Sequence, residues 1–234
     1  MIGTIYRYLA SLNLGLWLMG GVLLLMAVGS FASGGEGGSS LNDLPLFIWL
    51  RETPLATSWW LWATIGLLAV LAVNTVFCSI ESLRNKWERG NFLVRIAPQV
   101  MHLGFLLIMV AHLFSAWGGF KQVMEVGEGS TIGFPDGGVV QVGRIDSTIG
   151  PMGMPKDFSA QVRTVAGGTE SGTMRPNRPF FYRGFGIYLK EVGFVPAPVA
   201  LVEIHREPGA GWALAGALLF TAGNVVLLAV RRGR

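Results

Sequence analysis

The sequence predicts an integral membrane protein with four transmembrane helices and a small extracytoplasmic β domain. Two observations predict this class. The mean hydropathy is +0.51 and only 14% of the residues are charged, which is the profile of a membrane protein. The apolar residues also gather in four long runs, and about ninety residues of ordinary polarity separate the third run from the fourth.

The four apolar runs cover residues 9–32, 57–79, 98–118 and 210–230. Each run meets the requirement of roughly 20 residues for a helix that crosses ~30 Å of hydrocarbon. The first run is too long for the apolar part of a cleaved signal peptide, which usually has about 7–15 residues, so we expect a retained anchor. The predicted organisation is three helices with their loops over 1–118, a β-rich domain over 119–209, and a fourth helix with a basic tail over 210–234.

Basic residues lie on one side of these runs and predict the orientation. They precede the first run, separate the second from the third, and follow the fourth: Arg7, Arg84, Lys86, Arg89, Arg95, Arg231, Arg232 and Arg234. By the positive-inside rule, both termini are expected in the cytoplasm, with the protein in the cytoplasmic (inner) membrane. Loop 33–56 and the 119–209 domain then face outward. This domain holds nine basic and nine acidic residues, so the pI of 9.6 reflects topology and gives no support to nucleic-acid binding.

The loop and domain sequences suggest their own structures. The stretch "LPLFIWLRETP" (44–54) is amphipathic and is expected at the outer membrane interface. Alternating apolar and polar residues predict strands in 120–134, 137–146, 157–165, 185–194 and 197–209. Turns are expected at "PDGG" (135–138), "GPMGMP" (150–155) and "AGGTESG" (166–172), with the last strand entering the fourth helix through "REPGAG".

Two of the three histidines, His102 and His112, lie in the third apolar run. On a helix they are about 15 Å apart along the axis and about 80° apart around it, so they cannot ligate one haem iron from this helix alone. The other runs contain no histidine, and His205 lies in the β domain. If haem is bound, the chain supplies half of its axial ligation and a partner supplies the rest. The alternative for both histidines is a position near a membrane surface or a bond to a backbone carbonyl.

Other polar residues of the runs suggest structural roles. Asn74 is expected to form a hydrogen bond between helices. Cys78 is the only cysteine, so the chain can form neither an internal disulfide nor a CxxC redox pair, and we expect a packing residue. Motifs for serine hydrolases, zinc proteases and phosphate loops are missing from the sequence. His205 is expected to be an ordinary strand histidine.

Five segments, taken in order, resemble the ResB/CcsB (ResB-like) family of System II cytochrome c biogenesis proteins. They are "YLASLNLGLWLMGGVLLLMAVGSF", "LLAVLAVNTVFCSIESL", "HLGFLLIM", "RPNRPFFYRGFGIYLKEVGF" and "EIHREPGAGWALAGALLFTAGNVVLL". The second segment places Asn74 and Cys78 at familiar positions. The fourth is similar to the family's Asn-x-Pro, Tyr-x-Gly and Ile-Tyr signature. The domain of about ninety residues is smaller than is common in the family.

The resemblance implies a membrane subunit of the cytochrome c haem-delivery and ligation machinery. It implies a non-covalent haem b in the membrane, shared with a CcsA/ResC-like partner, with His102 as one axial ligand to the iron. Phe105, Leu106 and Met109, on roughly the same helix face, would line an apolar pocket for the porphyrin. The covalent attachment of haem to apocytochrome c would belong to the partner, so this chain would be a non-catalytic subunit of the haem lyase. A thioredoxin-like reductant is a further expected partner.

Several assignments stay open at this stage. His112 does not correspond to a family position and leaves room for a second haem. Arg175, Arg178 and Arg183 are candidates for contacts with haem propionates or a cytochrome, the alternative being a solvated loop. Two other functions also fit the sequence: a b-type cytochrome that oxidises quinol and serves an outer multihaem protein, and a haem-free scaffold.

Overall fold

The computed structural model describes residues 2–32, 45–86, 92–150, 155–165, 170–194 and 196–232. It divides the chain into two compact units. One unit comprises Met1–Trp117 together with Gly209–Arg234, and the other comprises Gly118–Pro208. The first half of loop 33–56 and the basic residues Arg89 and Arg234 lie outside the described residues, as do most of "GPMGMP" and part of "AGGTESG".

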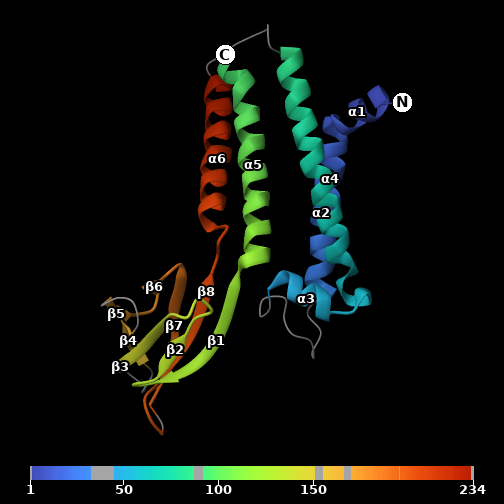
Figure 1. Cartoon of the computed structure of the whole chain (residues 1–234). Coiled ribbons are helices and arrows are strands. Elements are labelled where there is room, and N and C mark those ends of the chain that lie inside the picture. Colours follow the sequence, from blue (N-terminus) through green and yellow to red (C-terminus); the bar gives the residue numbers. More distant parts are fainter. Residues whose placement is uncertain are drawn as a thin grey trace. The chain divides into compact units, whose positions relative to one another are not determined.

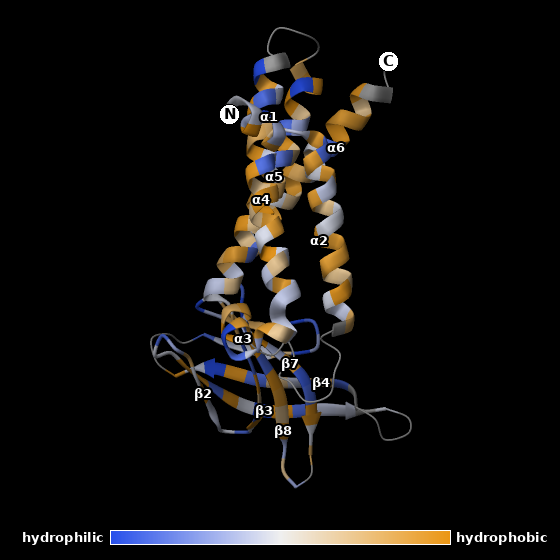
Figure 2. Ribbon diagram, turned by 90° about the vertical axis from the view of Figure 1, so that its right-hand side faces the viewer, coloured by the Kyte–Doolittle hydropathy of each residue, from blue (hydrophilic) through white to orange (hydrophobic). Residues whose placement is uncertain are grey.

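The first unit is helical and confirms the four long apolar helices. Its elements are α1 (Ile2–Leu9), α2 (Leu12–Ala32), α3 (Leu46–Glu52), α4 (Leu55–Lys86), α5 (Phe92–Gly118) and α6 (Ala210–Arg232) (Figure 1). Helices α2, α4, α5 and α6 are long and apolar enough to cross a membrane. Figure 2 shows apolar residues along these helices.

Helices α4 and α5 extend beyond the predicted runs 57–79 and 98–118. Hydropathy falls where α4 reaches Glu81 and Arg84, but the backbone hydrogen bonds of a helix do not depend on side-chain polarity. Helix α5 begins six residues before Pro98, which lies inside it. Proline removes one backbone donor, and such a loss is tolerated in membrane helices whose neighbours compensate for it.

A break in the first helical segment separates α1 from α2 at Ala10 and Ser11. Asn74 Nδ2 donates to the carbonyl oxygens of Leu9 and Ser11, at 2.6 and 3.0 Å, and Cys78 Sγ donates to that of Ala10 at 3.3 Å. Asn74 therefore bonds between helices, as the sequence predicts. Cys78 does more than pack, because its thiol contacts a carbonyl at the break.

Helices α5 and α6 pack through small residues that recur every seven positions. Ala97, Gly104 and Ala111 are buried on α5, and Gly209, Gly216 and Gly223 contact them from the start and body of α6. A Cβ atom on Gly104 would lie 2.6 Å from the Gly216 oxygen, and one on Gly223 would lie 2.8 Å from the Ala97 oxygen. The two backbones are therefore close together, and a side chain larger than hydrogen does not fit at these glycine positions.

The second unit consists of two antiparallel four-stranded sheets. The first has the order β1-β8-β7-β6, with β1 (Phe120–Gly127), β8 (Val199–Arg206), β7 (Phe185–Gly193) and β6 (Phe180–Tyr182). The second has the order β2-β3-β4-β5, with β2 (Thr131–Gly133), β3 (Val139–Ile149), β4 (Pro155–Thr164) and β5 (Ser171–Met174). Alternate residues of both sheets form one apolar core, which includes Val140, Val162, Met174, Ile187 and Val202.

This unit confirms the predicted β domain, but its strands differ from the predicted ones. Strand β6 lies outside every predicted strand. The first predicted segment, 120–134, divides into β1 and β2, which belong to different sheets. The turn predicted at 166–172 is wrong at its end, because Ser171 and Gly172 belong to β5 and pair with Arg163 and Val162 of β4. Ser171–Met174 has little intrinsic strand preference, so its conformation depends on pairing with β4.

Candidate functional site

His102 of α5 contacts α4 through one ring nitrogen. Its Nδ1 atom lies 2.7 Å from Oγ of Ser79, and this same hydroxyl lies 2.8 Å from the carbonyl oxygen of Thr75. No hydrogen bond within the described residues reaches Nε2 of His102. The imidazole is partly buried, with Nδ1 in contact with Ser79 and Nε2 without a hydrogen-bond partner among the described residues.

The remainder of α5 explains why His102 has this position. His102 and Gly104 are two residues apart, which corresponds to about 200° around a helix. The face with Gly104 packs against α6, so His102 lies on roughly the opposite face. Small residues thus hold one side of α5 against α6 and leave the other side to contact Ser79.

The other two histidines lie elsewhere. His112 is exposed on α5, ten residues after His102, and the structure does not bring the two together. His205 of β8 lies in the other unit, where Nε2 is 3.0 Å from Glu207 Oε1 and the ring contacts Tyr188. His205 is therefore a partnered strand histidine.

The apolar residues predicted around the haem remain on the α5 surface near His102. Phe105, Leu106 and Met109 are all partly buried. They lie within about 60° of His102 around the helix, since they follow it by three, four and seven residues. These side chains offer an apolar surface on the face of α5 that carries His102.

Gln99 adds a polar group that was not predicted from the sequence. It lies one helical turn before His102, and both its Oε1 and Nε2 atoms are buried without a hydrogen-bond partner. An unsatisfied buried amide costs about 1–3 kcal/mol. Such groups occur at sites where a ligand or partner completes the bonding.

The three arginines considered for propionate or cytochrome contacts are exposed on the β unit. The backbones of Arg175 and Arg178 pair with each other across a turn in which Asn177 has a φ of 61°. Arg183 lies 3.5 Å from Asp136 and over the ring of Tyr182. The signature residues Tyr182, Gly184 and Ile187 lie in a turn or in the core, which gives them a structural role.

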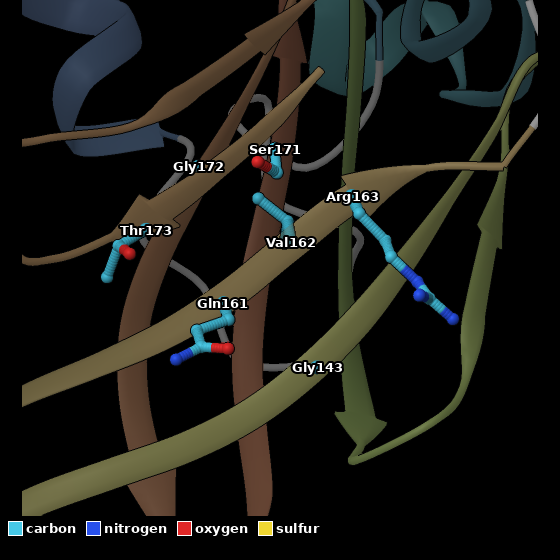
Figure 3. A pocket seen from close by; sticks show the side chains of 7 residues that line it. All are labelled: Gly143, Gln161, Val162, Arg163, Ser171, Gly172 and Thr173. Atoms are coloured by element: carbon cyan, nitrogen blue, oxygen red, sulfur yellow. The ribbon is translucent and has the colours of Figure 1, made fainter. Parts of the chain in front are cut away.

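A pocket on the β unit offers little chemistry. It has a volume of about 460 Å³ and lies over β3, β4 and β5, where the side chains in Figure 3 are mainly small or polar. Its lining residues are Gly143, Gln161, Val162, Arg163, Ser171, Gly172 and Thr173. The only charged side chain, that of Arg163, bonds to Gln141.

The single histidine nitrogen available at His102 suits one axial bond to the metal of a porphyrin better than the coordination of a bare metal ion. No group of three or more His, Cys, Asp or Glu side chains occurs among the described residues. A porphyrin supplies four equatorial nitrogens itself, so the protein needs to add only axial ligands. His102 can add one, through Nε2.

His102 was a candidate from the sequence alone, whereas Ser79 and Gln99 were not. Ser79 ends the second apolar run and gives no local signal, because its partner is 23 residues away in the sequence. Gln99 could have been found as an uncharged polar residue three positions before a histidine in an apolar run.

Comparison with known proteins supports the resemblance to the ResB/CcsB family. The ResB-like family model matches residues 87–197, which confirms the family predicted from the sequence. The matched stretch includes the whole of α5 and the β unit up to, but not including, β8. No curated protein matches the chain.

Among solved structures, one described as "Cytochrome c Heme Lyase CcmF" is similar, with a TM-score of 0.48 and 15% sequence identity. The similarity covers 88% of this chain and 33% of that one, so this chain spans about a third of its length.

Proposed function

We propose that this chain, whose residues 87–197 match the ResB-like family, is a membrane subunit of the cytochrome c assembly machinery that holds haem b together with a partner. The ResB-like match supports the general role in cytochrome c biogenesis. The finer assignment depends on His102, whose Nδ1 contacts Ser79 while Nε2 has no hydrogen-bond partner among the described residues.

His102 would be one axial ligand of the haem iron. An axial imidazole needs an unprotonated nitrogen towards the metal, and it almost always donates its other N–H to a nearby acceptor. The contact with Ser79 provides such a neighbour. When bound, haem supplies the iron centre that this ligation would retain in the membrane and whose reduction potential the axial ligands tune.

The second axial ligand would come from a CcsA/ResC-like membrane protein. Within the described residues, His112 is exposed and ten positions away, and His205 belongs to the other unit. Neither position supports ligation by His112 or His205 of the iron that His102 would bind. A shared site of this kind retains haem only in the complex, which would couple haem retention to assembly with the partner.

The membrane would surround α2, α4, α5 and α6, with both termini in the cytoplasm and the β unit outside the inner membrane. The basic residues before α2, around the α4–α5 connection and after α6 support this orientation. The β unit would contact the partner or the incoming apocytochrome c, and a thioredoxin-like protein would keep the cytochrome thiols reduced. Covalent attachment would take place on the partner.

The test is to purify the full chain with a CcsA/ResC-like partner and to record reduced-minus-oxidised spectra. We expect His102→Ala to abolish or greatly weaken a b-type signal, while His112→Ala, on the same helix, leaves it in place. An unchanged spectrum in His102→Ala would remove His102 from this role, and loss only in His112→Ala would place the ligand at the other histidine.

Deletion of the gene separates the proposed role from the two other functions. Loss of all c-type cytochromes is expected for an assembly subunit. Normal c-type maturation with rapid quinol-dependent reduction of a bound haem would indicate an electron-transfer subunit. A colourless complex that tolerates both histidine substitutions would indicate a haem-free scaffold.

A further inference from the structure

The hydroxyl of Ser79 contacts two groups, and it has one hydrogen to give. Oγ lies 2.8 Å from the carbonyl oxygen of Thr75 and 2.7 Å from Nδ1 of His102. A carbonyl oxygen can only accept a hydrogen bond. Both contacts are full hydrogen bonds when the hydroxyl donates to Thr75 and accepts from a protonated Nδ1.

We propose that Ser79 is the positioning residue of His102, and that it holds the imidazole as the Nδ1–H tautomer with the lone pair on Nε2. Nδ1–H of His102 then donates to Oγ of Ser79, and the Ser79 hydroxyl donates to the carbonyl oxygen of Thr75. Use of this lone pair for iron rests on the proposed function. The tautomer itself is a property of the ligand-free chain.

The opposite tautomer is less favourable in this geometry. With hydrogen on Nε2, the Ser79 hydroxyl would have to donate to Nδ1 and would lose its bond to the Thr75 oxygen. A hydrogen bond contributes about 0.5–1.5 kcal/mol net, and consecutive bonds in an apolar environment polarise and strengthen one another. The Nε2–H donor would also have no hydrogen-bond partner among the described residues.

The position of Ser79 also constrains the ring. Ser79 is on α4 and His102 on α5, so this bond fixes the imidazole plane relative to a second helix. A ligand imidazole must keep its plane and its lone-pair direction to bind a metal well, and neighbouring hydrogen bonds usually provide this. Ser79 does so without contacting the metal.

The first experiment reads the tautomer in the ligand-free full chain. Since the chain has three histidines, the double substitution His112→Gln and His205→Gln leaves His102 alone for ¹⁵N-histidine NMR in bilayers. We expect a protonated Nδ1 and an unprotonated Nε2. Ser79→Ala should lose this preference and Ser79→Thr, which keeps a hydroxyl, should restore it.

Thr64→Val is the matched control, because it removes a buried hydroxyl that bonds the Trp60 carbonyl of its own helix. This variant should leave the His102 signal unchanged. A protonated Nε2 in the parent chain, or an identical tautomer in Ser79→Ala, would overturn the proposal.

The second experiment uses the complex with its partner. We expect Ser79→Ala to lose haem about 10-fold faster, the lower end of the effects seen for groups that orient metal ligands, while Ser79→Thr stays near the parent. If the parent complex binds no haem but His102 is the Nδ1–H tautomer, the proposed function fails and this inference stands. If His102→Ala abolishes haem while Ser79→Ala changes neither readout, this inference fails alone.

Discussion

Gly104 of α5 and Gly216 of α6 lie so close that a Cβ atom on Gly216 would be 2.7 Å from the Gly104 carbonyl oxygen. Cβ atoms do not approach backbone oxygens this closely, so the two helices can keep this separation only with glycine at the contact. The same contact sets the orientation of α5, because the face opposite Gly104 is the one that presents His102 to Ser79.

Gly216→Ala should therefore destabilise the protein. Overpacking of a tight interface costs about 1–3 kcal/mol, and we expect the thermal unfolding midpoint in mild detergent to fall accordingly. Gly211→Ala is the matched control, because a Cβ atom there meets no atom within 4 Å. Equal effects of the two substitutions would contradict the close packing of α5 and α6.

Asn74→Leu should destabilise the α1–α2 break, because two carbonyl oxygens lose their donor. The expected loss is about 1–2 kcal/mol, since hydrogen bonds between membrane helices are modest. Denaturation in detergent and the reactivity of Cys78 with a maleimide measure it, with faster labelling expected in the variant. Asn224→Leu, which removes an exposed bond within α6, should have little effect, and a similar loss there would contradict the assignment.

Gln99→Met should stabilise the ligand-free chain. The substitution keeps the length of the side chain and removes two buried polar atoms that have no partner. We expect a gain of about 1 kcal/mol in the free energy of unfolding, measured in detergent. Gln122→Met, at an exposed position of β1, provides the comparison and should stay within about 0.5 kcal/mol of the parent. A loss of stability in Gln99→Met would mean that its amide is bonded in the folded protein.

Gly184→Ala should weaken the β6–β7 hairpin. Gly184 has a φ of 82°, beside Arg183 at 46°, so the two-residue turn requires the left-handed region at both positions. We expect faster hydrogen exchange in β6 and β7 of the full chain, equivalent to about 1 kcal/mol or more. Gly133→Ala, with no positive φ and no atom near the added Cβ, should leave exchange unchanged. Equal exchange in both variants would argue against this turn.

The phenol of Tyr6 should ionise at a higher pH than usual. Burial raises the pKa of Tyr6 above its ordinary value of 10.0, and the hydrogen bond and negative charge of Glu81 raise it further. The stabilisation that this gives is complete below the ordinary value and is lost as the pH rises through the higher folded value. Phenolate absorbance, compared between the parent and Tyr6→Phe, measures the shift, and Glu81→Gln should lower the pKa of Tyr6. A phenol that ionises at its ordinary value would contradict the contact between α1 and α4.

Part of the fold was predictable because it depends on local sequence. The long apolar runs predict α2, α4, α5 and α6, since about 20 apolar residues in succession favour a membrane-crossing helix. Alternation in 185–194 and 197–209 predicts β7 and β8, whose inward residues form the core of the β unit. His102 also stood out locally, as a polar side chain in an apolar run.

Contacts between segments that are distant in the sequence explain the features that were not predicted. Strand β5 takes its conformation from pairing with β4, and the ends of α4 and α5 continue past the apolar residues because backbone bonds persist there. Cys78 was expected to pack, yet its thiol contacts the carbonyl of Ala10, 68 positions earlier. None of these features has a signature within its own segment.

Hydropathy and alternation along the chain were therefore sufficient for the class of protein, its helices, most of its strands and the histidine of interest, because each depends on neighbours in sequence. Folding decided which face of α5 meets α6, which hydroxyl holds His102 and which amide is buried without a partner. Those relationships depend on contacts between side chains on different helices, and local patterns carry no information about which of them come together.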